Sequence, residues 1–134
     1  MSAEMFLAGW SSRLLSVLRI MSGLLLLQHG TAKYLGIPDI PQMANTSATS
    51  MSGIAGLMEL VGGVLIILGL FTRPVAFLLS GMTAVAYFYA HAARSFYPIL
   101  NGGELAALYC FVFLYLAAAG PGPWSLDAAW RNRA

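Results

Sequence analysis

Apolar residues run in four long stretches along this chain, and polar residues gather between them. The stretches cover residues 13–35, 52–71, 74–93 and 100–119. Each is close to the ~20 residues with which a helix crosses ~30 Å of hydrocarbon. None alternates with the period of two typical of a strand, and inside lipid only helices or closed barrels pair every backbone group. The pattern therefore predicts an all-α fold: an integral membrane four-helix antiparallel (up-down) bundle.

The connections predict how these helices follow one another. The short "TRP" at 72–74 makes the second and third helices an antiparallel hairpin, whereas 36–50 is the one long loop. The first stretch is hydrophobic enough for a signal peptide, but "QHGTAK" follows it in place of a small-residue cleavage site, so we interpret it as a mature helix. After the Gly/Pro break at 120–123, "WSLDAAW" predicts a short surface helix. We expect a single domain over 1–134.

The composition is typical of a membrane protein, whose partner is the lipid bilayer. Hydrophobic residues make up 59% of the chain and charged residues 9%, which leaves too little polar surface for a soluble domain of this size. The net charge of +2 comes from scattered arginines and not from a basic patch, which argues against nucleic acid as a partner. A single Cys excludes an internal disulfide and a thiol–disulfide relay within the chain.

The distribution of Lys and Arg predicts an orientation. Four crossings place both termini and the turn at 72–73 on one side of the membrane, with Arg19 a short way inside it. The opposite side carries only Lys33 and Arg94. The terminal side carries four arginines: Arg13, Arg73, Arg131 and Arg133. The positive-inside rule then predicts a multi-pass protein with both termini in the cytoplasm and the long loop outside.

Polar or ionisable side chains occur on all four predicted helices at a similar depth in the outer half. They are His29, Lys33, Glu59, His91, Asn101 and Glu104. A charged side chain within a bilayer costs ~2.5–3.5 kcal/mol or more, so it normally has a partner, and we expect this set to converge in one cavity. Two interpretations remain open. The residues form closed ion pairs that stabilise the bundle, or they line a pocket that binds a small ligand.

The chemistry of the set leaves the ligand open. Tyrosine and phenylalanine side chains could pack the bundle or line an apolar slot for a quinone ring. His29, Glu59, His91 and Glu104 could hold a metal such as Zn or Fe, although the Glu-x-x-His pairs of di-iron bundles are absent. The two His could also ligate a haem. Nothing further in the sequence requires a metal or a haem.

Arg19 lies on the terminal side, away from this set, and also needs a partner. The only acidic residues on that side are Glu4 and Asp127. We therefore predict that the C-terminal tail folds back, so that Asp127 and Arg19 form a structural ion pair.

Several motifs, taken together, resemble those of the DoxX family of small bacterial membrane proteins. They are "LRIMSGLLLLQHGTAKYLG", "GLMELVGGVLIILGLFTRPVA", "HAARSFYPILNGGELAALY" and "GPGPWSLDAAW", and the resemblance covers nearly the whole chain. It implies a four-helix fold in the bacterial cytoplasmic (inner) membrane. Relatives named DoxD belong to thiosulfate:quinone oxidoreductase, and others are linked to redox and oxidative-stress functions. The resemblance implies that eight residues of this chain are family motif positions, but it assigns them no chemical roles. They are Arg19, His29, Lys33, Glu59, His91, Asn101, Glu104 and Asp127.

Two functional hypotheses follow. The first is a membrane redox component that exchanges electrons with quinone, with the outer polar cluster as the head-group site and its carboxylate and His groups moving protons. The second is a non-catalytic accessory or assembly subunit whose apolar outer faces dock to a larger membrane enzyme complex. A small transporter is a third idea, which the lack of a broken helix repeat argues against.

Overall fold

The computed structural model describes residues 2–132, and within them the chain is all-helical, as predicted. Four long helices form the body: α2 (Ser11–Tyr34), α3 (Met51–Leu68), α4 (Thr72–Ala90) and α6 (Glu104–Ala119). Five short elements accompany them: α1 (Ala3–Ala8), η1 (Pro41–Met43), η2 (Ala92–Arg94), α5 (Pro98–Asn101) and α7 (Leu126–Arg131). The predicted short helix after the Gly/Pro break is confirmed as α7, which Ser125 caps by accepting a hydrogen bond from the Ala128 N–H.

Three helical segments are long and apolar enough to cross a membrane: Ser11–Tyr34, Met51–Leu68 and Thr72–Arg94. The predicted fourth span over 100–119 is not continuous. Gly102 adopts a left-handed conformation with φ 74° and ends α5, so that α6 begins only at Glu104 and has 16 residues. Helix length therefore supports three crossings of the predicted four.

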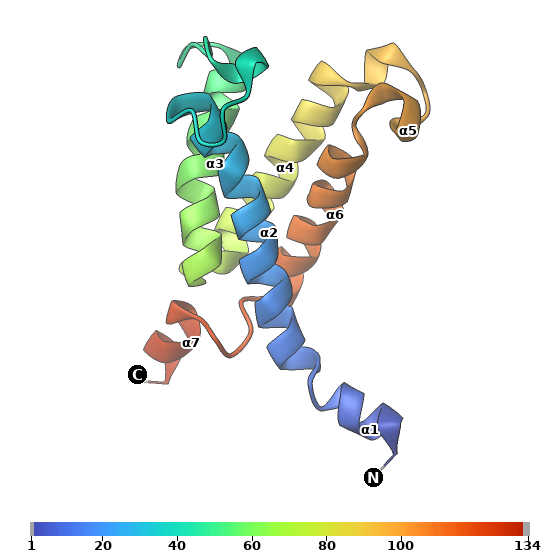
Figure 1. The fold of residues 1–134 in the computed structure, drawn as a ribbon. Helices are drawn as coiled ribbons and strands as arrows, with labels where there is room; N and C mark the ends of the chain where they lie inside the picture. The colour runs from blue at the N-terminus through green and yellow to red at the C-terminus, as the bar shows by residue number, and fades with distance from the viewer. Residues whose placement is uncertain (1, 133–134) are drawn as a thin grey trace.

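The long helices lie in two antiparallel pairs (Figure 1). α2 packs mainly on α3 and α4 on α6, and the pairs meet chiefly where α3 contacts α4. Figure 1 shows the pairs close together where the two termini and the α3–α4 turn lie, and apart at the other end. We call these the closed end and the open end.

Small residues bring α2 and α3 close together. A Cβ atom added to Gly30 would lie 2.9 Å from the carbonyl oxygen of Gly56, and one added to Gly63 would lie 3.1 Å from the Cβ of Leu27. Such contacts let two backbones approach, which is how helices associate in lipid without a hydrophobic driving force between them. The α2–α3 pair is thus fixed by close packing.

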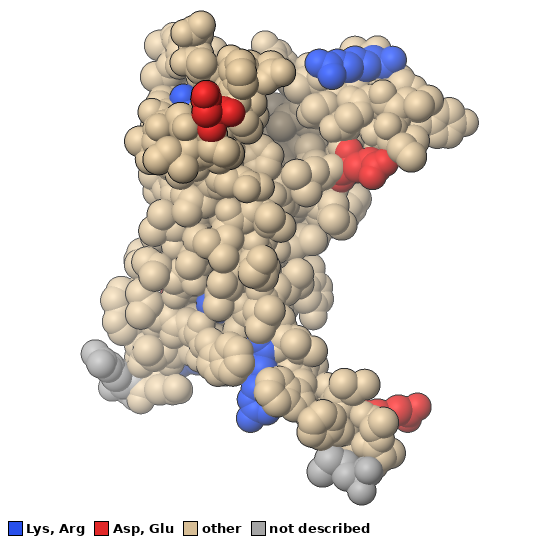
Figure 2. Space-filling model, in the orientation of Figure 1, with Lys and Arg blue, Asp and Glu red and all other residues tan. Residues whose placement is uncertain are grey.

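A narrow apolar core joins the two pairs, and most other apolar side chains face outward. Ile66, Phe113 and Leu116 are fully buried in this core, whereas Phe77 and Phe111 are 64% and 68% exposed on the outer surface. Figure 2 shows that the visible face is almost free of charged side chains between its two ends. An apolar band of this kind, with charge at its margins, is the surface of a protein that lies in a bilayer.

Candidate functional site

A cavity of about 610 Å³ opens between the two helix pairs at the open end. Its walls come from α2, α3, α4 and α6, together with Met43 of η1 and His91 just after α4. Most lining side chains are apolar, and its volume lies in the usual range of small-molecule sites. Four of the six predicted site residues line it: His29, Lys33, Glu59 and His91.

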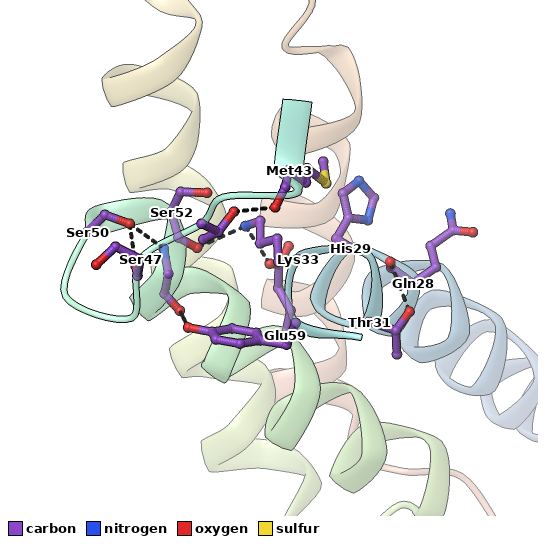
Figure 3. Close-up of polar contacts among 12 residues, drawn as sticks. Gln28, His29, Thr31, Lys33, Met43, Ser47, Ser50, Ser52 and Glu59 are labelled. Carbon is purple, nitrogen blue, oxygen red and sulfur yellow. Dashed lines mark hydrogen bonds and ion pairs between the residues drawn. The ribbon is translucent and has the colours of Figure 1, made fainter. Parts of the chain in front are cut away.

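Lys33 and Glu59 form an ion pair across the α2–α3 interface. Lys33 Nζ lies 2.7 Å from Glu59 Oε1, and the two side chains are only 9% and 8% exposed. Lys33 also donates a hydrogen bond of 3.1 Å to the Ser52 carbonyl at the start of α3 (Figure 3). The absence of a side chain at Gly56 makes room for this, because a Cβ there would lie 2.9 Å from Lys33 Cδ. The pair is therefore built into the cavity wall.

The two His side chains have matching hydrogen-bond arrangements. His29 Nδ1 lies 3.0 Å from the Leu25 carbonyl, and His91 Nδ1 lies 3.1 Å from the Asn101 carbonyl. A carbonyl oxygen can only accept, so in each ring Nδ1 is the donor and carries the hydrogen. When the ring is neutral, Nε2 keeps a lone pair, and neither Nε2 atom bonds to any of residues 2–132. Both rings can accept a proton or a hydrogen bond from a ligand.

Asn101 is buried but does not line the cavity. Its side-chain amide donates to the Tyr87 hydroxyl and the Ser95 carbonyl, each at 3.0 Å, and its Oδ1 accepts from the Gly103 N–H at 2.8 Å. Its own carbonyl accepts from His91. The structure therefore gives Asn101 a supporting position, in which it holds the 95–103 segment and fixes His91 at the rim.

Glu104 lies outside the cavity, contrary to the expectation that it would converge with the other site residues. It is exposed in the first turn of α6, where the positive end of the helix dipole favours a carboxylate. Leu105, Ala106 and Tyr109, on another face of α6, line the cavity instead.

The possible metal set is not assembled. Among residues 2–132, no group of three or more His, Cys, Asp or Glu side chains gathers closely enough to hold a metal ion. Glu104 is on the outer surface, and the Glu59 carboxylate is bonded to Lys33.

Tyr109, one of the aromatic residues expected either to pack the bundle or to line an apolar slot, lines the cavity. It is 6% exposed, and its ring lies edge-on to His29 with centroids 6.2 Å apart. A signal was present in the sequence, since Leu105, Ala106 and Tyr109 fall on one helical face. The sequence alone does not show which face of this helix points to the cavity.

Arg19 does not form the predicted ion pair with Asp127. It is fully buried at the closed end, and its guanidinium donates only to backbone carbonyls: those of Ile66 (2.9 Å), Ile67 (3.4 Å), Pro121 and Trp124 (2.6 Å). The tail does fold back, as predicted, but it presents carbonyls to Arg19. Five N–H donors in a planar fork can serve several acceptors at once, and the Ile66 carbonyl accepts from Arg19 in addition to the Gly69 N–H.

Asp127 instead caps the N-terminus of α4, on the far side of the α3–α4 turn from the carbonyls that Arg19 contacts. Its two carboxylate oxygens accept hydrogen bonds of 2.9 Å from the backbone N–H groups of Phe71 and Thr72, at the start of α4. Arg73 in turn donates to the Ala118 carbonyl near the end of α6 at 2.9 Å. Asp127 and Arg73 therefore each meet a helix terminus of opposite polarity.

The apolar outer surface and three membrane-length helices define a multi-pass membrane protein. A family profile described as DoxX matches residues 14–92, which cover most of α2 and all of α3 and α4. The chain belongs to the DoxX family, as the motifs predicted.

Three relatives extend the comparison. An "Uncharacterized protein" of Haemophilus influenzae is 47% identical over 84% of this chain and 87% of its own length. An "Uncharacterized membrane protein" of Mycobacterium tuberculosis is 30% identical over 87% of this chain and 81% of its own length. The "Putative oxidoreductase CatD" of Bacillus subtilis is 26% identical over 83% of this chain and 82% of its own length. No solved structure matches the chain.

Proposed function

We propose that this protein is a quinone-linked component of a membrane redox system and that it holds the quinone head group in the open-end cavity. The observation that carries the proposal is the placement of His29, Lys33, Glu59 and His91 around one cavity whose other walls are mostly apolar. A quinone head group needs both features, because it is an apolar ring with two acceptor oxygens. The name of the Bacillus subtilis relative gives separate support for redox chemistry.

The side chains suit the proton chemistry of such a ligand. Reduction of a quinone to a quinol takes up two electrons and two protons. The Lys33 ammonium can donate a hydrogen bond to a carbonyl oxygen, and the Nε2 atoms of His29 and His91 can accept or relay a proton. In this proposal the electrons come from, or pass to, a partner redox protein in the membrane.

Quinone retained by the protein tests this proposal. The chain is extracted from its own membrane into lipid nanodiscs, and quinone per chain is measured by chromatography with ultraviolet detection. We expect native protein to retain quinone and Glu59→Gln to lose most of it. Glu104→Gln is the matched control, since it makes the same change on an exposed carboxylate. If native protein carries no quinone but co-purifies with a larger enzyme, the accessory-subunit hypothesis replaces this one.

We also propose four crossings of the inner membrane with both termini in the cytoplasm. At ~1.5 Å per residue, α6 spans about 24 Å, and Figure 1 shows it returning beside α4 to the closed end. The arginines near the closed end place that end, with both termini, on the cytoplasmic side by the positive-inside rule. In a Cys110→Ala background, Ser47→Cys should react with an impermeant thiol reagent in spheroplasts and Asn132→Cys should react only after lysis. The opposite labelling pattern overturns the orientation.

A further inference from the structure

A groove of about 330 Å³ lies between α3 and α4, nearer to the closed end than the cavity. Apolar side chains and one glycine line it: Leu57, Met58, Val61, Gly62, Leu65, Val75, Leu78 and Leu79. Gly62 lets the two helices approach, since a Cβ atom there would lie 2.8 Å from Leu79 Cδ2. The lining side chains of Val61 and Leu78 are 62% and 61% exposed, so the groove opens on the outer surface, which faces lipid.

The groove continues the cavity along the same pair of helices. Met58 lines both spaces. On α4, Leu79 lines the groove and Met82 lines the cavity, and residues three apart are neighbours on a helix surface. α3 and α4 diverge from their turn at the closed end, so the two spaces follow one another towards the open end (Figure 1). Met58 is half-buried, and its unbranched thioether chain adapts readily to a neighbouring ligand.

The two spaces suit different parts of one molecule. The cavity carries the polar side chains of His29, Lys33 and Glu59, whereas the groove is lined without a polar side chain. Val61 lies near the middle of α3, which places the groove at the depth where the hydrocarbon chains of a bilayer lie. A quinone that dissolves in a membrane combines a polar ring with a long apolar chain. A soluble quinone has no chain and would leave the groove without an occupant.

We propose that the ligand is a lipid-soluble quinone whose apolar chain lies in the α3–α4 groove while its ring occupies the cavity. This inference rests on the proposed quinone function and adds to it the substrate class and the route of entry. The ring enters sideways from the bilayer, between α3 and α4, and not from the water outside. The groove follows α3 from Leu57 to Leu65, about 12 Å at ~1.5 Å per residue, which a decyl chain can fill.

The first test locates the chain directly. The probe is decyl ubiquinone with a photoreactive diazirine at the end of its chain, bound to native protein in lipid nanodiscs. Adducts are mapped by mass spectrometry after illumination. We expect them within 57–65 and 75–79, and we expect an excess of the same ring without a chain to abolish them, because it displaces the head group.

The second test fills the groove from its edge. Val61→Phe adds bulk at an exposed lining residue, and Val64→Phe is the matched control on α3, since Val64 is 44% exposed and lines neither space. Both variants should unfold at the native temperature. Affinities for decyl ubiquinone and for the ring without a chain are measured by calorimetric titration in detergent.

We expect Val61→Phe to lower the affinity for decyl ubiquinone about 10-fold, which corresponds to lost contacts of about five chain atoms. Its affinity for the ring without a chain should stay at the native value. Val64→Phe should match native protein for both probes.

The outcomes separate the two proposals. Absence of decyl ubiquinone binding to native protein overturns both. Binding with adducts in the 36–50 loop overturns only the groove, since the chain then leaves the cavity outward. Groove adducts that persist with an excess of the chainless ring also overturn it, because the groove then takes any bilayer chain. An unchanged decyl affinity in Val61→Phe, or an equal loss for both probes, likewise contradicts a chain in the groove and leaves the quinone site standing.

Discussion

At the closed end Arg19 donates to four backbone carbonyls and Asp127 accepts from two backbone amides, so each charge is bonded to the main chain. At the open end Lys33 bonds to the Glu59 carboxylate and to the Ser52 carbonyl, and both side chains line a cavity. The closed-end charges therefore hold segments of main chain together, whereas the open-end pair borders a space that a ligand can enter.

The comparison teaches that burial of a charge does not by itself indicate a binding site. Arg19 is the most deeply buried charge in the described part of the chain, yet its donors join the end of α3 to the folded-back tail. The Lys33–Glu59 pair is slightly more exposed and faces open space. We infer that stability depends mainly on the closed end and ligand binding on the open end. The predictions below test that division.

Replacement of Arg19 should have the largest effect on stability. Arg19→Met removes the buried donor that four backbone carbonyls share, and we expect a loss of about 3–5 kcal/mol in the free energy of unfolding. Arg13→Met is the control on the same helix, since Arg13 is exposed and contacts only the Trp10 ring among aromatic groups. Chemical unfolding in micelles measures both. If Arg19→Met lowers the free energy of unfolding by less than about 1 kcal/mol, the closed end does not have the stabilising role proposed here.

The Lys33–Glu59 pair should show strong coupling. Lys33→Met leaves a buried carboxylate without its cation, and we expect a loss of about 3 kcal/mol in unfolding free energy. The double variant with Glu59→Leu removes both charges and should regain most of that loss while binding no quinone. Unfolding and quinone titration are measured on the same samples. A double variant as unstable as Lys33→Met would show that the pair is needed for folding itself.

Removal of the Asp127 carboxylate should have a smaller effect. Asp127→Ala leaves two amides at the start of α4 without acceptors, which costs about 1–2 kcal/mol in unfolding free energy. Asp39→Ala serves as control because Asp39 is exposed in the α2–α3 loop. Thermal unfolding measures the difference. Equal stability of the two variants would mean that the hydrogen bonds from the Asp127 carboxylate to the start of α4 contribute nothing to the free energy of unfolding.

Replacement of Glu104 should have the smallest effect. Since its carboxylate is exposed at the start of α6, Glu104→Gln should change unfolding free energy by about 0.5 kcal/mol or less and leave quinone affinity unchanged. A fluorescence titration against native protein measures the affinity. Loss of quinone binding would mean that Glu104 belongs to the binding site and would contradict its placement outside the cavity.

Much of the fold could be predicted from the hydrophobic pattern, because residence in lipid demands a long apolar run. The spans of α2, α3 and α4 and the short helix α7 follow from such runs and from a capping residue. His29 and Lys33 could be placed on one face from their spacing of four. These predictions use information that lies within a single helix.

The parts that failed depend on relations between helices. The packing of α6 against its neighbours places Tyr109 at the cavity and leaves Glu104 exposed. Backbone carbonyls carry no sequence signature, so the partners of Arg19 could not be read from the residues, and an acidic side chain was the natural expectation. Asn101 was placed at the right end, but its role depends on contacts with Tyr87 and Ser95.

One titration tests the division between the two ends most directly. Decyl-tailed ubiquinone is titrated into two variants of known stability, Arg19→Lys at the closed end and Lys33→Met/Glu59→Leu at the open end, at a temperature where both are folded. We predict that Arg19→Lys is less stable than native protein but binds quinone with native affinity. The double variant should be nearly as stable as native protein and should not bind. If affinity instead falls in proportion to stability in both variants, the cavity has no separate role and the account is contradicted.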